Sequence, residues 1–460
     1  MKNQRALNVS PKRVKGMKPI RILPLGFICI ILTGALLLTL PISSAGGEGL
    51  SFGDAIFTAT SATCVTGLVV VDTGTHFSLF GQIVILIMIQ LGGLGFMTVA
   101  TLLFMAAGKR ISLKERMTIA ESLGESRLAG IVSLGLRAVK LTFIIEGVGA
   151  CLLAIRFIPM YGLWKGLWFS VFHSVSAFCN AGFDLIGGYN SFTPFAADPL
   201  INLPVISLII LGGLGFIVLM DIYRNFRRPR LLCIQSKIVL LVSSVLILAE
   251  ALSFLTLEWG NPETMGNMTF LQKVQASLFQ SVTLRTAGFN TIDQNAMHDS
   301  SKLISSLLMI TGGAPAGTAG GVKVTTIALL ILTVRAQIKS RRDTEAFGRR
   351  VTIVTVRRAL CVFLLAFALI IAASLIISTA EYGRLQTEGF LNQLYEIASA
   401  LGTVGLSVGV TAAASPVTRG VLCLLMFVGR VGFMTAALSL SAGRQDQDVI
   451  RFPSADIMVG

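Results

Sequence analysis

Four short segments of the chain end on a glycine and share a pattern suited to holding a bare cation. Each begins with an aromatic residue and continues through serine, alanine and threonine. A cation stripped of water needs a cage of oxygens, and four backbone segments that meet on one axis can supply stacked rings of carbonyls. Glycine reaches the positive φ values that turn successive carbonyls inward. We predict a cation filter made by the last three residues of each segment: Val65, Thr66 and Gly67; Asn180, Ala181 and Gly182; Thr286, Ala287 and Gly288; Thr403, Val404 and Gly405.

The spacing of these glycines decides between a filter and ordinary helix breaks. A single glycine in a membrane protein usually ends or packs a buried helix. Here four occur in register, 106 to 117 residues apart, and none of the four endings carries a carboxylate. We therefore favour a filter built from backbone oxygens.

Residues 312–321 contain five glycines and a proline inside an otherwise apolar stretch, a composition that no helix survives. Backbone freed at that depth must lie in protein or line a cavity. We predict a movable gate on the cytoplasmic side of the filter, with a static kink as the alternative. The following Gly321–Lys323 lacks the ending of a nucleotide-binding loop. The gate residues are Gly312, Gly313, Ala314, Pro315, Ala316, Gly317, Thr318, Ala319, Gly320 and Gly321, with Arg430.

Arg430 stands where two related strings of the chain have Gly93 and Gly213. An arginine in a spanning segment is costly and is by default a functional hypothesis. We expect carbonyls of the 312–321 loop to be its partners, with snorkelling to the membrane surface as the alternative. For Glu146 and Glu250, the other charges within apolar segments, we expect buried pairing.

Residues that could carry other chemistry are scattered. The seven cysteines lie far apart without a Cys-x-x-Cys pair, and the three histidines do not cluster. We expect polar interface roles for the histidines, no catalytic residues and no cofactor in this chain. An intramembrane enzyme would need a carboxylate pair, a Ser/His dyad or a metal cluster, none of which the apolar segments offer.

The elements that must position the filter form four tandem units. The string Leu91–Phe96 reappears as Leu211–Phe216, and a relative, Val428–Phe433, closes the series. Ahead of each second apolar helix lies a helix too short to span, which must dip to mid-membrane and return. We predict an all-α membrane protein of four tandem helix–pore loop–helix repeats, with eight transmembrane helices in pseudo-fourfold arrangement around one central pore. The short helices are expected at 51–64, 167–179, 272–285 and 390–402.

Composition and charge place this chain in a membrane. Its 460 residues are 53% hydrophobic and 13% charged, with a mean hydropathy of +0.78. The net charge of +15 resides in five basic clusters between apolar blocks, rather than in a nucleic-acid surface. Clusters of this kind mark the cytoplasmic side, so we expect a multi-pass cell-membrane protein with both termini cytoplasmic. A cleaved signal peptide at 22–40 is disfavoured, because the first unit would lose its outgoing helix.

The expected organisation has six parts, and the four repeats are called quarters one to four below. The parts are a basic cytoplasmic N-terminus at 1–21, repeats at 22–108, 131–224, 236–335 and 354–442, and a cytoplasmic C-terminal tail at 443–460. The third repeat has the broken second helix.

Over residues 20–445 the chain resembles the Trk/Ktr/HKT superfamily, most of all the membrane subunit of bacterial Ktr potassium uptake systems (KtrB/KtrD type). The features that carry the resemblance are the four repeats, the run Thr63–Thr73, the 312–321 loop and Arg430. The resemblance implies potassium uptake, with transported K⁺ at the filter. Sodium-favouring members tend to carry serine at the first filter glycine, where this chain has Gly67.

The same resemblance implies a homodimer and a separate cytosolic ring of regulatory subunits (KtrA/KtrC type), which bind the nucleotide, ATP or ADP, and control the gate. Basic loops at 109–127, 224–237 and 335–358 offer docking material, and the apolar tail end is expected to contribute to the dimer. A secondary transporter of another cation or small solute remains the alternative, although it would predict inverted repeats.

Overall fold

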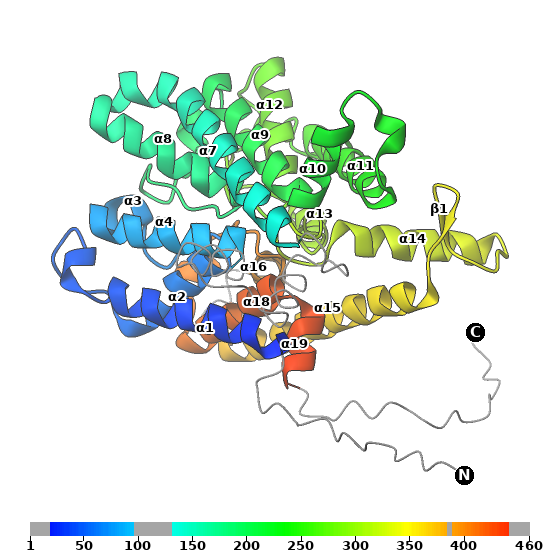
Figure 1. Ribbon diagram of the computed structural model, residues 1–460. Coiled ribbons are helices and arrows are strands. Elements are labelled where there is room, and N and C mark those ends of the chain that lie inside the picture. Colours follow the sequence, from blue (N-terminus) through cyan, green and yellow to red (C-terminus); the bar gives the residue numbers. More distant parts are fainter. Residues whose placement is uncertain (1–18, 96–130, 384–388, 441–460) are drawn as a thin grey trace, which may run out of the picture.

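The computed structural model describes residues 19–95, 131–383 and 389–440, almost all of them helical or in loops between helices (Figure 1). The predicted N-terminal part up to residue 18, the end of repeat one, the basic loop 109–127 and the C-terminal tail lie outside the described residues. Within the described residues, one two-stranded hairpin, Glu345–Ala346 (β1) with Arg349–Arg350 (β2), departs from the all-α prediction. Its turn residues Phe347 and Gly348 both have positive φ, as a tight hairpin turn requires.

Four described helices are long and apolar enough to cross a membrane, and each opens one quarter. Their outer faces carry exposed large hydrophobic side chains, such as Phe367 at 56% and Leu248 at 68% exposure, which suits contact with lipid rather than water. These helices are α1 (Pro19–Leu38), α7 (Ile131–Tyr161), α11 (Ile234–Leu257) and α15 (Ile353–Ala380).

A short helix follows each of these, within a few residues of the predicted bounds. The aromatic residue that opens each predicted filter segment is fully buried, so the core lies around the short helices: Phe57, Phe172, Phe279 and Tyr395. The short helices are α2 (Phe52–Thr63), α8 (Leu163–Phe178), α12 (Phe270–Thr283) and α16 (Gly389–Gly402).

The second helices of quarters one, two and four begin at a side-chain cap, whereas that of quarter three, which follows His298, has none. Ser78 and Ser415 accept hydrogen bonds from main-chain N–H groups of the first turn, and Asp198 does the same ahead of Pro199. The helices that begin here are α4 (Leu79–Leu94), α9 (Pro199–Leu214), α13 (Asp299–Met309) and α18 (Pro416–Val431).

Quarter two also has a broken second helix, which the prediction for quarter three did not include. In quarter two, α9 and α10 (Phe216–Asn225) meet at Gly215 with a bend of 99°. Gly215 has φ +83°, a value that ends a right-handed helix. Gly95 ends α4 and Gly432 separates α18 from α19 (Phe433–Leu440) with similar positive φ.

The remaining elements connect the quarters. Figure 1 shows α14 (Val324–Ile338) and α15 running side by side and joined by the β1–β2 hairpin. Short elements lie in the loops: η1 (Pro41–Ser43), α3 (Thr73–His76), η2 (Thr193–Phe195), η3 (Pro229–Leu231) and α17 (Val410–Ala413).

Candidate functional site

The four predicted filter glycines lie against one another in a closed ring. All four have positive φ, between 71° and 97°. A Cβ added to any of them would come within 3.0 Å of the carbonyl oxygen that precedes the next glycine. A side chain at any of these positions would therefore displace main chain. The contacts run from Gly67 to Ala181, Gly182 to Ala287, Gly288 to Val404, and Gly405 back to Thr66.

The residue two positions before each glycine is also left-handed, although none is glycine. Val65, Asn180, Thr286 and Thr403 have φ between 53° and 67°. A left-handed residue costs roughly 1–2 kcal/mol for an L-amino acid, so the four segments hold the same unfavourable backbone. Such a conformation persists only where the surrounding structure determines it.

Hydroxyl groups of the short helices fix the segments that follow. Ser61 accepts from the Gly67 N–H at 3.1 Å, and Ser399 accepts from the Gly405 N–H at 3.0 Å. In the other two quarters the hydroxyl donates instead, Ser176 to the carbonyl of Phe183 at 2.7 Å and Thr283 to that of Phe289 at 2.5 Å. The serines and threonines of the predicted pattern thus tie each helix to its loop.

Two buried side chains behind the ring hold the loops beyond it. His173 Nε2 accepts from the Leu185 N–H while its Nδ1 donates to the Phe169 carbonyl, which fixes one neutral tautomer. Glu396 accepts from the Val408 N–H at 3.1 Å at the corresponding position in quarter four, and from the hydroxyl of Thr411 at 2.6 Å. Both therefore stabilise loop structure, which fits the polar interface role expected for the histidines.

Sequence reasoning missed a link between quarters two and three. Asn180 Nδ2 donates to the Arg285 carbonyl at 3.2 Å, and the Arg285 guanidinium donates to Ser243 of α11 at 3.1 Å. Arg285 is only 8% exposed and interacts electrostatically with Glu250. An arginine three residues before a filter glycine was the available signal. Gln90 of quarter one donates to the Glu146 carboxylate of quarter two at 3.2 Å. Glu146 and Glu250 thus each have a partner inside the protein, Gln90 and Arg285 respectively, as expected.

The four glycines form the floor of a cavity of about 460 Å³ whose walls carry Asp72, Asp184 and Asp293. Carboxylates around a concave opening raise the local concentration of cations. Asp184 accepts from the Ile186 N–H at 3.0 Å, yet burial and then the Asp72 charge raise the pKa of its carboxyl to about 6.

Several main-chain bonds fasten the 312–321 loop to its surroundings. The Ala314 N–H donates to the Gly213 carbonyl, and the Thr318 N–H donates to the Gly212 carbonyl. The Gly321 N–H donates to the Gly429 carbonyl. The Thr318 hydroxyl reaches the Phe178 carbonyl of α8 at 3.1 Å. The loop therefore connects the second-helix breaks of quarters two and four.

Two glycines at the end of the loop pack against the filter segment of quarter four. A Cβ on Gly320 would meet the Thr403 side chain, and one on Gly321 would approach the Gly402 carbonyl. Neither glycine lines the cavity that the four filter glycines share. The loop therefore touches the ring segment at Thr403 without lining the cavity through these two glycines.

Arg430 makes the predicted contact with the loop. Its guanidinium donates to the Thr318 carbonyl, and also to the Gly92 and Gly93 carbonyls at the end of α4. The Lys323 ammonium group also donates to the Ala319 carbonyl, at 2.7 Å. Two cations therefore bind carbonyls of one short loop.

Three glycine-rich strings seat the second helices of quarters one, two and four against a short helix. A Cβ would strike the Thr63 carbonyl from Gly92, the Phe178 carbonyl from Gly212 and the Leu401 carbonyl from Gly429. Among residues 19–95, 131–383 and 389–440, no three His, Cys, Asp or Glu side chains group as metal ligands.

Comparison with known families decides the identity of the fold. The family model described as "TrkH: Cation transport protein" matches residues 26–448. The chain belongs to this family. A TrkH-family chain of this kind is a multi-pass membrane transport protein and not an enzyme.

Relatives cover the whole TrkH-family chain. The potassium/sodium uptake protein NtpJ of Enterococcus hirae is 39% identical over 99% of this chain and 100% of its own. The Ktr system potassium uptake protein B of Bacillus subtilis is 39% identical over 96% and 97%. The crystal structure of the potassium transporter TrkH from Vibrio parahaemolyticus matches 94% of this chain and 86% of its own, with a TM-score of 0.71 at 17% identity, so the fold is shared.

Proposed function

We propose that the chain takes up potassium ions across the cell membrane through the ring around Gly67, Gly182, Gly288 and Gly405. The observation that carries the proposal is the closed ring, in which each glycine faces the carbonyl that precedes the next. Carbonyl oxygens replace the hydration shell of a potassium ion. The names of the two relatives, a potassium/sodium uptake protein and a potassium uptake protein, both include potassium and support the choice of ion.

The proposed path begins in the cavity with Asp72, Asp184 and Asp293, which concentrates cations above the ring. The ion then passes the twelve filter residues 65–67, 180–182, 286–288 and 403–405. No side-chain charge touches it there, because the oxygens are main-chain groups.

The 312–321 loop with Arg430 serves as the gate in this proposal. Gly320 of the loop packs against Thr403, and Arg430 donates to the Thr318 carbonyl, which supports a place for the loop on the far side of the ring from the cavity. A positive charge beside the path opposes a cation until the loop and the guanidinium move together.

The proposed architecture keeps the four repeats at 22–108, 131–224, 236–335 and 354–442, with the parts 1–21 and 443–460 in the cytoplasm. Each repeat crosses the membrane twice, which makes eight crossings in pseudo-fourfold arrangement. The repeated order of long helix, short helix and second helix supports this arrangement.

The proposed assembly is a homodimer regulated by a cytosolic ring of KtrA/KtrC-type subunits that bind ATP or ADP. The name of the Bacillus subtilis relative, part of a Ktr system, supports a partnered complex. The basic segments 224–237 and 335–358 are the described surfaces proposed for docking.

The test is potassium-dependent growth and rubidium uptake in cells that lack their own potassium uptake systems. We expect rescue by the chain, and loss of rescue with Gly288→Asp at equal membrane expression, because a carboxylate would fill the ring. Gly260→Asp is the matched control, since no atom lies within 4 Å of a Cβ there. Failure to rescue with a cytosolic partner supplied would favour a carrier of another cation or solute.

A further inference from the structure

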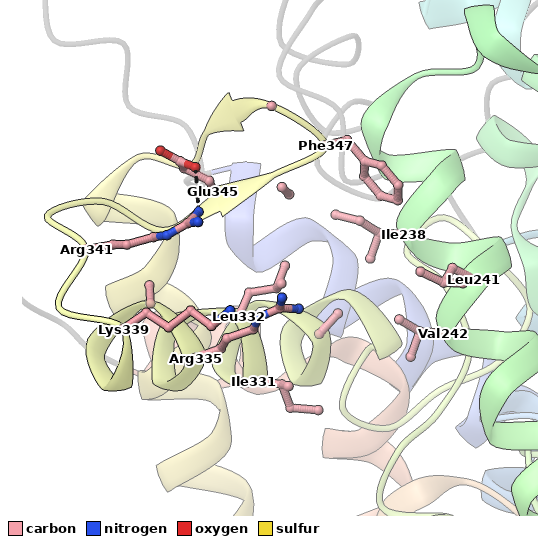
Figure 2. Close-up of a pocket in the computed structure, with 14 residues that line it drawn as sticks. Ile238, Leu241, Val242, Ile331, Leu332, Arg335, Lys339, Arg341, Glu345 and Phe347 are labelled. Carbon is pink, nitrogen blue, oxygen red and sulfur yellow. Dashed lines mark hydrogen bonds and ion pairs between the residues drawn. The ribbon is translucent and has the colours of Figure 1, made fainter.

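A groove lies between α11, α14 and the β1–β2 hairpin, away from the ring and the loop (Figure 2). Its volume is about 400 Å³. Figure 2 shows the α14 side chains along one side, the α11 side chains opposite them, and Phe347 of the hairpin beside Ile238. The lining side chains divide into an apolar stretch and a basic end.

The apolar stretch consists of side chains that the fold leaves exposed. Leu241 of α11 is 57% exposed and Ile331 of α14 is 60% exposed. Ile238, Val242 and Leu332 complete the walls. Both helices are apolar elements of a membrane protein, so the groove opens toward hydrocarbon and suits an alkyl chain.

The basic end carries positive charge without a matching negative charge. Arg335 and Lys339 lie one turn apart on α14 and are both exposed. Within the described ranges neither side chain forms an ion pair or a hydrogen bond, and Arg341 is paired with Glu345 at 3.1 Å. This end of α14 leads into the basic segment 335–358, which we expect to face the cytoplasm.

From this division we infer that the groove binds one molecule of an anionic phospholipid. An acyl chain lies along Ile238, Leu241 and Ile331, and the phosphate meets Arg335 and Lys339. A basic pocket between membrane helices on the cytoplasmic side suits a lipid headgroup. A soluble anion would gain nothing from the apolar walls, and a zwitterionic lipid would gain little from the two cations.

The experiment measures lipid bound to the purified full-length chain by native mass spectrometry in detergent. Phosphatidylglycerol and phosphatidylcholine of identical acyl chains are the probes. We expect a first phosphatidylglycerol to be retained in preference to phosphatidylcholine. Because each surface cation contributes about 1 kcal/mol toward anionic lipid, Arg335→Gln with Lys339→Gln should weaken that first binding step by about 30-fold.

Two further variants separate the site from general charge. Arg357→Gln with Arg358→Gln removes the same charge from exposed positions on α15 outside the groove, and should leave the first step unchanged. Leu241→Trp keeps all charges but fills the apolar stretch, and should weaken binding of both lipids. Glycerophosphate at millimolar concentration should not displace the lipid, whereas a site for a free phosphate would release it.

The inference is overturned if phosphatidylglycerol and phosphatidylcholine bind equally, or if both charge-neutralising pairs lower binding alike. Unaltered lipid binding in the Arg335→Gln/Lys339→Gln variant would also overturn the inference. The two side chains would then be candidates for contact with a protein partner instead. None of these outcomes depends on ion conduction, so the lipid site and the proposed function fail separately.

Discussion

At the scale of single residues, the filter glycines combine two requirements that no other residue meets together. Gly67 has φ +97°, and a Cβ would lie 2.6 Å from the Ala181 carbonyl oxygen. The conformation disfavours most side chains, and the contact means that any side chain must displace the neighbouring main chain. The position therefore controls the place of a carbonyl in the neighbouring segment.

Gly67→Ser should lower the preference for potassium over sodium while the chain still folds and reaches the membrane. The added Cβ must push the Ala181 carbonyl outward, and a loss of discrimination of about tenfold corresponds to ~1.4 kcal/mol. Rubidium uptake against rising sodium in proteoliposomes measures it. Gly420→Ser, in α18 with no atom within 4 Å of a Cβ, is the control. An unchanged preference would count against the filter assignment.

Asp184 makes uptake depend on pH at limiting potassium. Its carboxyl has a pKa raised to about 6, so it is charged above that pH and neutral below it. As the pH falls from 7 to 5 the cavity loses a negative charge and recruits fewer cations. Uptake should fall a few-fold over this range in the native chain. In Asp184→Asn, uptake at pH 7 should be lower and should change less between pH 7 and pH 5. If this variant depended on pH as strongly as the native chain, another group would be responsible for the effect.

At the scale of elements, the 312–321 loop, our proposed gate, is held in place by specific bonds. It is fastened to Gly213, Gly429 and Arg430. Since these contacts come from quarters two and four, the loop can leave only if bonds to both are released.

Replacing 312–321 by a shortened linker should raise uptake in the absence of any cytosolic partner. The bonds that hold the closed arrangement would be lost, and the path beyond Thr403 would be open. Rubidium flux into proteoliposomes holding the purified chain measures this directly. Gly67→Ser combined with the deletion separates flux through the filter from leakage, and unchanged uptake would return the loop to a passive kink.

The sequence was enough to predict the elements that repeat, but not those that depend on a distant partner. The four short helices and their glycines recur in register, so their bounds were predicted within a few residues. The break at Gly215 was not predicted because each glycine costs a helix only ~1 kcal/mol, and the bond that replaces the helical one, from the Phe216 N–H to the Ala316 carbonyl, comes from a distant segment. The bonds of Arg430 to Gly92 and of Asn180 to Arg285 join quarters that no local pattern connects.

At the scale of the whole molecule, the first and last quarters lie in contact. Gly405 lies against Thr66 in the ring, and Asp54 of α2 pairs with Arg419 of α18 at 2.5 Å. A partly exposed ion pair of this kind contributes at most about 1 kcal/mol. It therefore indicates that the two quarters are in contact but adds little to the stability of that contact. Quarters one and four, farthest apart in sequence, thus complete the circle.

Because one polypeptide supplies all four segments of the ring, each copy of the chain should conduct independently of the others. A cell that makes native chain and Gly288→Asp chain in equal amounts should keep about half of its transport, since a defective copy cannot contribute a segment to the pore of a neighbour. Loss-of-function alleles would then be recessive. Dominant inhibition in such a mixed population would mean that the conducting unit is shared between chains.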